Sequence, residues 1–139
     1  MSISSISPLI DRLTVIGVGL IGGSVASALK ARGLVGHVVG CARSTQTLDL
    51  AMERGLIDSG TTHVGEAASN ADVVLLATPV GTMRNLLPQV GEALQTGAIL
   101  TDAGSTKRRV VDIARNALAD QFEHFVPGHP VAGSESSGP

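Results

Sequence analysis

The chain has little that would mark a secreted, membrane-bound or nucleic-acid-binding protein. It has one cysteine, Cys41, in 139 residues, so no disulfide can form within it, and a reducing compartment is favoured. Ten Lys and Arg stand against twelve Asp and Glu, and the main cationic cluster is Lys107-Arg108-Arg109. Such a balance gives no electrostatic footprint for nucleic acid or an anionic membrane.

Long apolar runs are missing as well. No segment approaches the roughly 20 apolar residues that span a bilayer. The first residues, Met1–Pro8, lack the basic leader and apolar core of a signal peptide. The four histidines and the cysteine are scattered, without the spacing of a metal site. These absences predict a cytoplasmic protein that binds no metal, no nucleic acid and no membrane.

What the chain does contain is 43% apolar residues and 17 glycines, which suit one domain with many tight strand–helix turns. Short β-branched runs alternate with longer helical patterns, as in the βαβ units of a parallel sheet. The predicted strands are 13–16, 37–41, 73–77, 99–101 and 125–126, the predicted helices are 24–32, 45–54, 84–94 and 107–118, and 56–70 is expected to hold a short strand and a short helix. The predicted fold is therefore α/β. It is a doubly wound, mainly parallel sheet of the Rossmann type with helices on both faces, formed by residues 12–139 after an N-terminal tail of residues 1–11.

A glycine-rich loop, Gly17-Val18-Gly19-Leu20-Ile21-Gly22, follows the first predicted strand. Gly17 permits a tight turn, Gly19 lets a pyrophosphate approach the backbone, and Gly22 lets the helix pack closely on the sheet. The helix N-terminus offers free N–H groups and a partial positive charge to phosphates. Glycines that merely end a strand are the alternative, but the order strand, loop, helix and strand favours a dinucleotide site.

The end of the second strand bears on which dinucleotide is bound. NAD-binding domains usually carry Asp or Glu about 20 residues past the loop, where it binds the ribose 2′-hydroxyl. Ala42 stands there, twenty positions after Gly22, and Arg43, Ser44 and Thr45 follow. Arg43 can pair with a 2′-phosphate, and Ser44 or Thr45 can donate hydrogen bonds to it. In the alternative, Arg43 is solvated and Ser44 caps the next helix. The pattern favours NADP, and NAD is the second candidate.

Two more loops follow strands at the carboxyl edge, where open α/β sheets bind ligands. Thr78, Pro79 and Val80 are placed to line the nicotinamide side of the cleft. Alternatively, Thr78 caps the following helix and Pro79 is its first residue. In the loop 102–107, one hydroxyl is expected to cap the next helix, which leaves the other free to contact a substrate.

The segment 127–135, PGHPVAGSE, places an imidazole, a hydroxyl and a carboxylate within seven positions, at His129, Ser134 and Glu135. A neutral imidazole, with an ordinary pKa of about 6.5, is suited to accept the hydroxyl proton of a carbinol that loses a hydride. A lone histidine is more often structural. The position of His129 after the last strand, between two glycines, favours a functional role, whereas the other three histidines are expected to be structural or exposed.

These segments resemble the prephenate/arogenate (cyclohexadienyl) dehydrogenase family of tyrosine biosynthesis. The resemblance runs from about Leu13 to the last residue. Many dehydrogenases share the glycine loop, whereas DAGSTK at 102–107 and GHPVAGSE at 128–135 are more restrictive. The resemblance implies NAD(P)-dependent oxidative decarboxylation of prephenate and/or arogenate to 4-hydroxyphenylpyruvate or tyrosine plus CO2.

The resemblance also implies roles for residues at matching positions. His129 would hydrogen-bond the substrate hydroxyl and act as the catalytic base. Ser105 would orient that hydroxyl and help to place the nicotinamide, and Ser134 would contact the substrate. Glu135 matches an acidic residue near the entrance of the site.

Family members carry a helical domain after this one, which forms a homodimer and supplies cationic substrate-binding residues. The chain stops at Pro139 without it. We therefore expect a cofactor-binding portion that turns over little or no substrate by itself. The other candidates are a β-hydroxyacid-type dehydrogenase or pyrroline-carboxylate reductase, which the His129 segment disfavours, a non-catalytic dinucleotide-binding module, and a purely structural domain.

Overall fold

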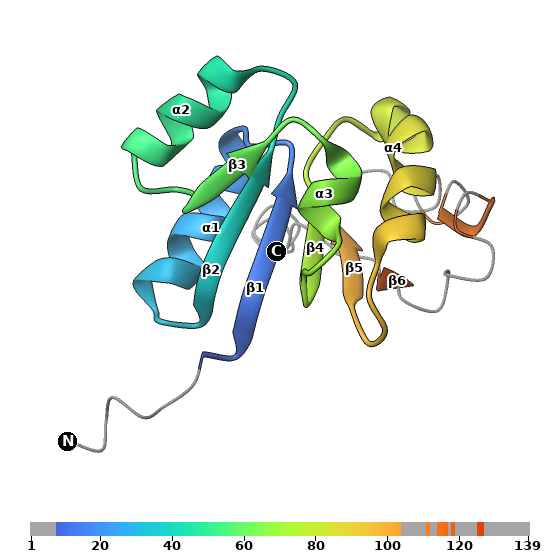
Figure 1. The fold of residues 1–139 in the computed structure, drawn as a ribbon, viewed down its shortest axis with the longest axis horizontal. Helices are drawn as coiled ribbons and strands as arrows, with labels where there is room; N and C mark the ends of the chain where they lie inside the picture. The colour runs from blue at the N-terminus through green and yellow to red at the C-terminus, as the bar shows by residue number, and fades with distance from the viewer. Residues whose placement is uncertain (1–7, 104–110, 112–113, 117, 119–124, 127–139) are drawn as a thin grey trace, which may run out of the picture.

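A parallel sheet of six strands forms the centre of the computed structural model, which describes residues 8–103, 111, 114–116, 118 and 125–126 (Figure 1). The strands are β1 (Ile10–Ile16), β2 (Val35–Cys41), β3 (Ser59–Thr61), β4 (Val73–Leu76), β5 (Ile99–Asp102) and β6 (Phe125–Val126). Their order across the sheet is β3-β2-β1-β4-β5-β6. This is the strand order of doubly wound dinucleotide-binding folds. The predicted fold class is confirmed, and each pair of neighbouring strands is parallel.

Helices cover both faces of the sheet. They are α1 (Leu20–Ala31), α2 (Thr45–Glu53), α3 (Val64–Ala68) and α4 (Val80–Ala93), and residues 111, 114–116 and 118 are also helical. Alternate residues of each strand point to opposite faces, so two apolar clusters form. Leu13, Val15 and Leu75 pack with Ala26 of α1 and Leu48 of α2. The other cluster joins strands to α3, α4 and the helical residues near 114, through Ile16, Val74, Leu76, Leu100, Ala67, Met83, Leu87, Val90 and Ala114.

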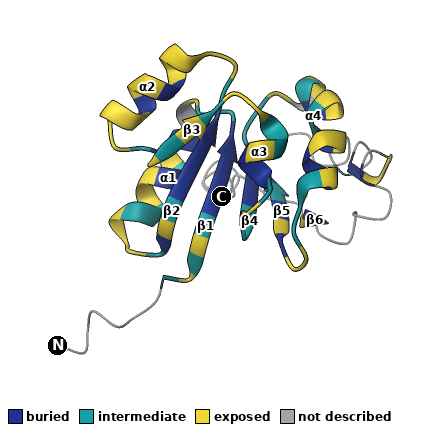
Figure 2. Ribbon diagram, viewed as in Figure 1, coloured by how far each residue is buried: buried dark blue, intermediate teal, exposed yellow. Residues whose placement is uncertain are grey.

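The buried positions lie along the middle strands (Figure 2). Ile16 is in register with Cys41 of β2 and with Leu76 of β4, so the carboxyl ends of these three strands meet at one edge. β1 and β4 are neighbours in the sheet but not in the sequence, and α1 and α4 leave them on opposite faces. This change of direction creates the crevice in which doubly wound folds bind their ligands.

Several element boundaries differ from the predicted ones. β1 begins at Ile10, three residues earlier, because Ile10 pairs with Val35 of β2. α1 begins at Leu20 rather than at Ser24, since the close packing of the glycine loop holds its last residues in the first helical turn. α4 begins at Val80 rather than at 84, and Pro88 lies inside it without dividing it.

The short strand and helix expected within 56–70 are present as β3 and α3. Gly33 and Gly55 directly follow the C-cap residues of α1 and α2, with φ of 68° and 73°, the left-handed conformation in which glycine commonly ends a helix. In the described part of the chain, no helix has both the length and the apolar character needed to cross a membrane.

Candidate functional site

The glycine loop turns the chain from β1 into α1 at the carboxyl edge of the sheet. Gly17 has a φ of 96°, a conformation that favours glycine. Its N–H donates to the carbonyl of Cys41, at 2.9 Å, and the N–H of Gly19 donates to the carbonyl of Gly17, also at 2.9 Å. The loop is therefore held against the end of β2, and Gly19 becomes the N-cap residue of α1.

Two of the three loop glycines are needed for packing. A Cβ on Gly22 would lie 2.6 Å from the carbonyl oxygen of Gly17 and 2.8 Å from Cγ1 of Val15. A Cβ on Gly17 would lie 2.7 Å from Cγ2 of Thr78, at the end of β4. All three distances are shorter than a real Cβ contact, so the loop, β1 and β4 approach one another only because these positions lack side chains.

The third glycine is open. A Cβ on Gly19 would meet nothing within 4 Å. Its backbone begins α1, and no side chain of the described residues caps this helix end, nor does its first turn hold an acidic residue. The backbone N–H groups of Leu20, Ile21 and Gly22 lie in that first turn and have no carbonyl partner within the helix. An anion fits here, because the N–H groups and the helix dipole both favour negative charge.

The end of β2 carries no carboxylate. Ala42 is half-buried, and its N–H donates to the carbonyl of Thr61 at 3.4 Å. Arg43 is exposed and forms no ion pair with another described residue. Ser44 is the N-cap residue of α2, and its Oγ accepts from the N–H of Thr47 at 3.2 Å. The capping role considered for Ser44 is therefore confirmed. The hydroxyl of Thr47 lies 3.0 Å from the same oxygen.

The loop after β4 differs from one of the two interpretations made above. Pro79 is the N-cap residue of α4 rather than its first residue, and no side chain caps this helix, so the capping role for Thr78 is wrong. The Thr78 hydroxyl oxygen is instead buried, without a hydrogen-bond partner among the described residues. Val80 is the first residue of α4. Buried polar atoms are nearly always hydrogen-bonded, so this oxygen, beside the glycine loop, is available to a ligand.

Polar contacts at the opposite edge of the sheet are structural. Burial raises the pKa of Asp58, but hydrogen bonds from Lys30 and the Val38 N–H, with the nearby positive charge, hold it below its ordinary value. Lys30 Nζ lies 2.6 Å from the Asp58 carboxylate. Nε2 of His37 lies 3.0 Å from the Ser59 hydroxyl, in keeping with the structural role expected for this histidine. These contacts join the end of α1 to β2 and β3.

Cys41 is buried at the end of β2. Burial raises the pKa of its thiol, so it stays a neutral core residue. Within the part of the chain that the structure describes, no group of three or more His, Cys, Asp or Glu is placed to hold a metal ion.

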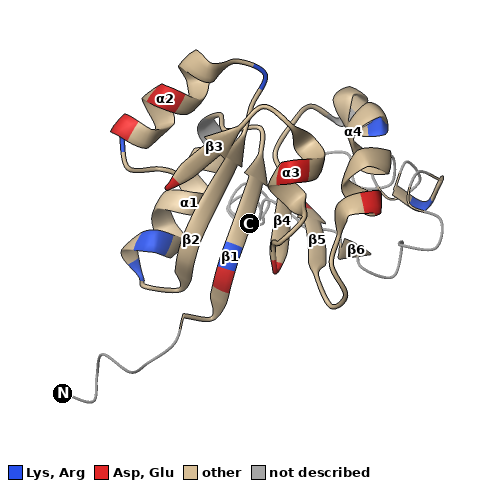
Figure 3. Cartoon of the chain, viewed as in Figure 1, with Lys and Arg blue, Asp and Glu red and all other residues tan. Residues whose placement is uncertain are grey.

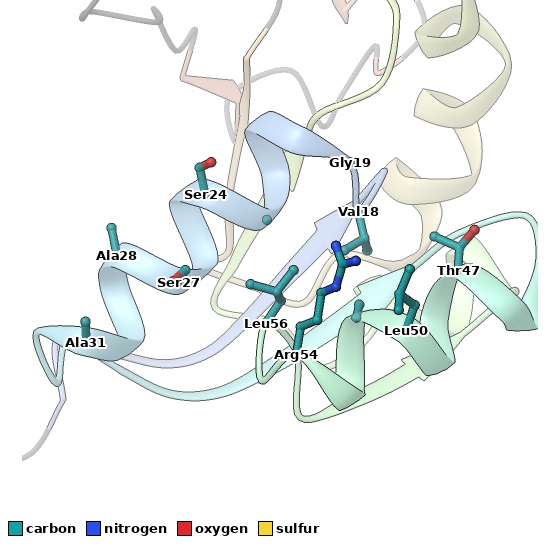
Figure 4. Close-up of a pocket in the computed structure, with 12 residues that line it drawn as sticks. Val18, Gly19, Ser24, Ser27, Ala28, Ala31, Thr47, Leu50, Arg54 and Leu56 are labelled. Atoms are coloured by element: carbon teal, nitrogen blue, oxygen red, sulfur yellow. The ribbon is translucent and has the colours of Figure 1, made fainter.

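A groove of about 700 Å³ runs between α1 and α2 from the glycine loop (Figure 4). Apart from Val18 and Gly19 of the glycine loop, its lining was not predicted. One wall consists of Val18, Gly19, Gly23, Ser24, Ser27, Ala28 and Ala31, and the other of Thr47, Leu50, Ala51, Arg54 and Leu56. Thr47, Leu50 and Arg54 recur at helical spacing, so their common face was detectable, although what they face was not. Elsewhere, charges of both signs are spread over the described elements without a large patch (Figure 3).

Four predicted site residues lie outside the described residues. They are Ser105 in the loop after β5 and His129, Ser134 and Glu135 after β6. Asp102, at the end of β5, is buried, with 2% of its surface exposed. Among the described residues, the site therefore consists of the glycine loop, the end of β2 and the Thr78 loop.

The matching family model and the curated relatives agree on one family. The family described as "Prephenate dehydrogenase, nucleotide-binding domain" matches residues 25–139. The chain is 37% identical to the prephenate dehydrogenase of Lactococcus lactis over 128 residues, which cover 91% of this chain and 36% of that protein. It spans 34–43% of the length of the curated relatives that it matches.

Solved structures agree with the sequence matches. The prephenate dehydrogenase of Aquifex aeolicus, in complex with hydroxyphenyl propionate and NAD+, superposes with a TM-score of 0.78 at 33% identity. The match covers 88% of this chain and 42% of that one. The arogenate dehydrogenase of Synechocystis gives a TM-score of 0.75 at 30% identity, over 86% of this chain and 40% of the other.

Proposed function

The chain belongs to the prephenate dehydrogenase family, as its nucleotide-binding domain, and from this we propose that it is the cofactor-binding part of an NAD(P)-dependent dehydrogenase that oxidatively decarboxylates prephenate and/or arogenate. The family match over residues 25–139 is the observation that carries the proposal. The glycine loop, which precedes that match, supports it independently through the open backbone at Gly19.

The residues at this edge suit a dinucleotide. The first turn of α1 would hold the pyrophosphate, and the buried Thr78 hydroxyl, which has no partner among the described residues, would gain one from the ligand. A bound nicotinamide would supply the hydride acceptor. The protein's own task is then to orient the substrate hydroxyl and accept its proton.

We assign proton transfer to His129 and orientation of the hydroxyl to Ser105. Ser134 would contact the substrate, and Glu135 would lie near the entrance. An imidazole with an ordinary pKa is half neutral near pH 6.5, so a base of this kind works near neutral pH. These four roles stay predictions, as do the homodimer of a whole protein and its cytoplasmic location.

We further propose NADP as the preferred cofactor, with NAD as the second candidate. Ala42 offers no carboxylate to repel a 2′-phosphate, and the exposed guanidinium of Arg43 adjoins it in the sequence. Arginine pairs with phosphate through two parallel hydrogen bonds. The Ser44 hydroxyl keeps donor capacity, because in its contact with the Thr47 hydroxyl either oxygen can be the donor.

The cofactor proposal is tested by titrating the chain with NADPH and NADH, and then repeating both titrations with Arg43→Asp. We expect tighter binding of NADPH, and its loss in the variant, because a carboxylate would repel the 2′-phosphate. Arg32→Asp, an equal charge change at the exposed far end of α1, is the matched control. Equal affinities for the two cofactors, unchanged by Arg43→Asp, would contradict the NADP preference.

The activity is tested on a protein that carries this domain together with a helical domain of the family. We expect prephenate or arogenate to reduce the cofactor, and His129→Asn to abolish turnover while leaving dinucleotide binding intact. Saturable binding without turnover of either substrate would make the chain a non-catalytic dinucleotide-binding module. Turnover of short β-hydroxyacids in their place would assign a different dehydrogenase.

A further inference from the structure

The groove between α1 and α2 is lined by one cationic side chain to which the proposed function assigns no role. Arg54 follows the last residue of α2 and lines the groove together with Val18 and Gly19 of the glycine loop. We infer that Arg54 is a second specificity-determining residue, which binds the 2′-phosphate of the dinucleotide in addition to Arg43. The inference rests on the proposed preference for NADP.

The direction of the side chain supports this assignment. Side chains of an α-helix lean toward its N-terminus, and the N-terminus of α2 lies next to the carboxyl end of β2. Figure 4 accordingly shows Arg54 pointing into the groove, with its guanidinium toward Val18 rather than away from the helix pair. The guanidinium of Arg54 therefore extends from the end of α2 toward the glycine loop that would hold the phosphates.

The charge of the groove is not compensated by its lining. Arg54 is the one charged residue among the twelve that line it, and it forms no ion pair with another described residue. Two carboxylates of the neighbouring segments already have partners. The Thr61 hydroxyl donates to Glu66 at 2.6 Å, and Lys30 lies 2.6 Å from Asp58. The exposed guanidinium of Arg54 is therefore able to pair with an anion of the ligand, and a phosphate matches the fork of its N–H groups.

The shape and the polarity of the groove agree with a nucleotide. Its volume of about 700 Å³ lies within the range of small-molecule sites, which is about 300–1,000 Å³. Thr47 adds a hydroxyl to the lining, 3.0 Å from that of Ser44, while Leu50 and Leu56 add apolar surface. The groove thus brings the glycine loop, at Val18 and Gly19, together with Thr47 near the start of α2 and Arg54 at its end.

The experiment measures binding of NADPH, NADH, 2′,5′-ADP and 5′-ADP to the chain by calorimetry. Arg54→Met removes the charge and keeps an unbranched apolar stem against the leucines. We expect this variant to bind NADPH and 2′,5′-ADP about tenfold or more weakly, which corresponds to about 1.4 kcal/mol. Binding of NADH and 5′-ADP should stay unchanged. Arg54→Lys should retain part of the affinity, and Arg32→Met, at the exposed end of α1, should retain all of it.

The other outcomes separate the inference from the proposal on which it rests. If the unmodified chain binds NADPH and NADH equally, the NADP preference fails and the role of Arg54 fails with it. If Arg43→Asp abolishes the preference while Arg54→Met leaves it intact, only the role of Arg54 is wrong. Equal weakening of all four ligands by Arg54→Met would also overturn it, since the 2′-phosphate would not be the group recognised. Unchanged binding of all four ligands is expected if the groove, with its exposed Leu50, instead receives a protein segment, and that result would overturn the role of Arg54 as well.

Discussion

The glycine loop allows packing and ligand binding to be separated by two substitutions three residues apart. Gly22→Ala would place a methyl group 2.6 Å from the carbonyl oxygen of Gly17 and 2.8 Å from Cγ1 of Val15. Gly19→Ala would place the same group where no heavy atom lies within 4 Å. The φ of Gly19, −110°, is accessible to alanine. The two variants thus carry the same chemical change, an added methyl group, in different surroundings.

The size of the expected effect follows from these contacts. An added methyl in a packed interior costs about 1–3 kcal/mol, and a backbone oxygen cannot rotate away as a side chain would. The higher helix propensity of alanine offsets up to about 1 kcal/mol of this cost at position 22, which lies in α1. We expect Gly22→Ala to lower the free energy of unfolding by about 1–2 kcal/mol. Gly19→Ala should lower it by less than about 1 kcal/mol, because its methyl group meets no described atom and the cost is only that alanine is a poorer N-cap residue than glycine.

Dinucleotide affinity should behave differently. Gly19→Ala fills the space over which the pyrophosphate would approach the backbone, so NADPH binding should weaken strongly although the fold is intact. Urea denaturation gives the stability of each variant. Titration with NADPH, without urea and at a temperature at which each variant is fully folded, gives the affinity. A Gly22→Ala chain as stable as the unmodified one would refute the packing argument. Full NADPH affinity in Gly19→Ala would refute the position of the pyrophosphate.

Three further predictions concern contacts of single side chains. Ser44→Ala removes the cap of α2 and should lower the free energy of unfolding by about 1 kcal/mol in urea denaturation. Asp58→Asn should lower it at neutral pH by at most about 1 kcal/mol, because the partner Lys30 is partly exposed and solvent screens the pair. The pKa of Asp58 is lowered in the folded chain, so the stabilisation by this carboxylate is fully present above its ordinary pKa of 3.8 and is lost as the pH falls through the folded pKa. The free energies of unfolding of the two chains should therefore converge at acid pH. Thr78→Val should leave the free energy of unfolding unchanged or raise it, because it removes a buried hydroxyl that has no partner among the described residues. NADPH should bind this variant more weakly, and unaltered affinity would exclude a contact of the hydroxyl with the cofactor.

Steady-state turnover of the chain alone should be little or none with prephenate or arogenate, because the chain spans only 34–43% of the length of the curated relatives that it matches. A rate in the ordinary enzyme range of about 1–1,000 per second would contradict this expectation.

Much of the fold was predictable because its signals are local. The apolar run 73–76 is covered on both faces, and its β-branched and aliphatic residues identify a strand wherever it lies in the sheet. The first residues of α1 and α4 were harder to predict from the sequence. Gly22 and Gly23 lie inside α1, and Pro88 lies inside α4. These residue types have low intrinsic helix propensity, and they are tolerated because tertiary packing stabilises the helix around them.

The candidate site shows the same division between local and long-range information. The roles of Gly17, Gly19 and Gly22 depend on a turn between adjacent elements, so a short motif could specify them. The burial of the Thr78 hydroxyl, which has no hydrogen-bond partner among the described residues, could not be foreseen, because Thr78 lies against Gly17, which is far away in the sequence. Arg54 is harder still, since its place depends on how two helices on one face of the sheet lie side by side. A motif identifies the phosphate loop of such a fold, but the residues that choose between cofactors are set by packing, and they can be found only once neighbouring helices are in place.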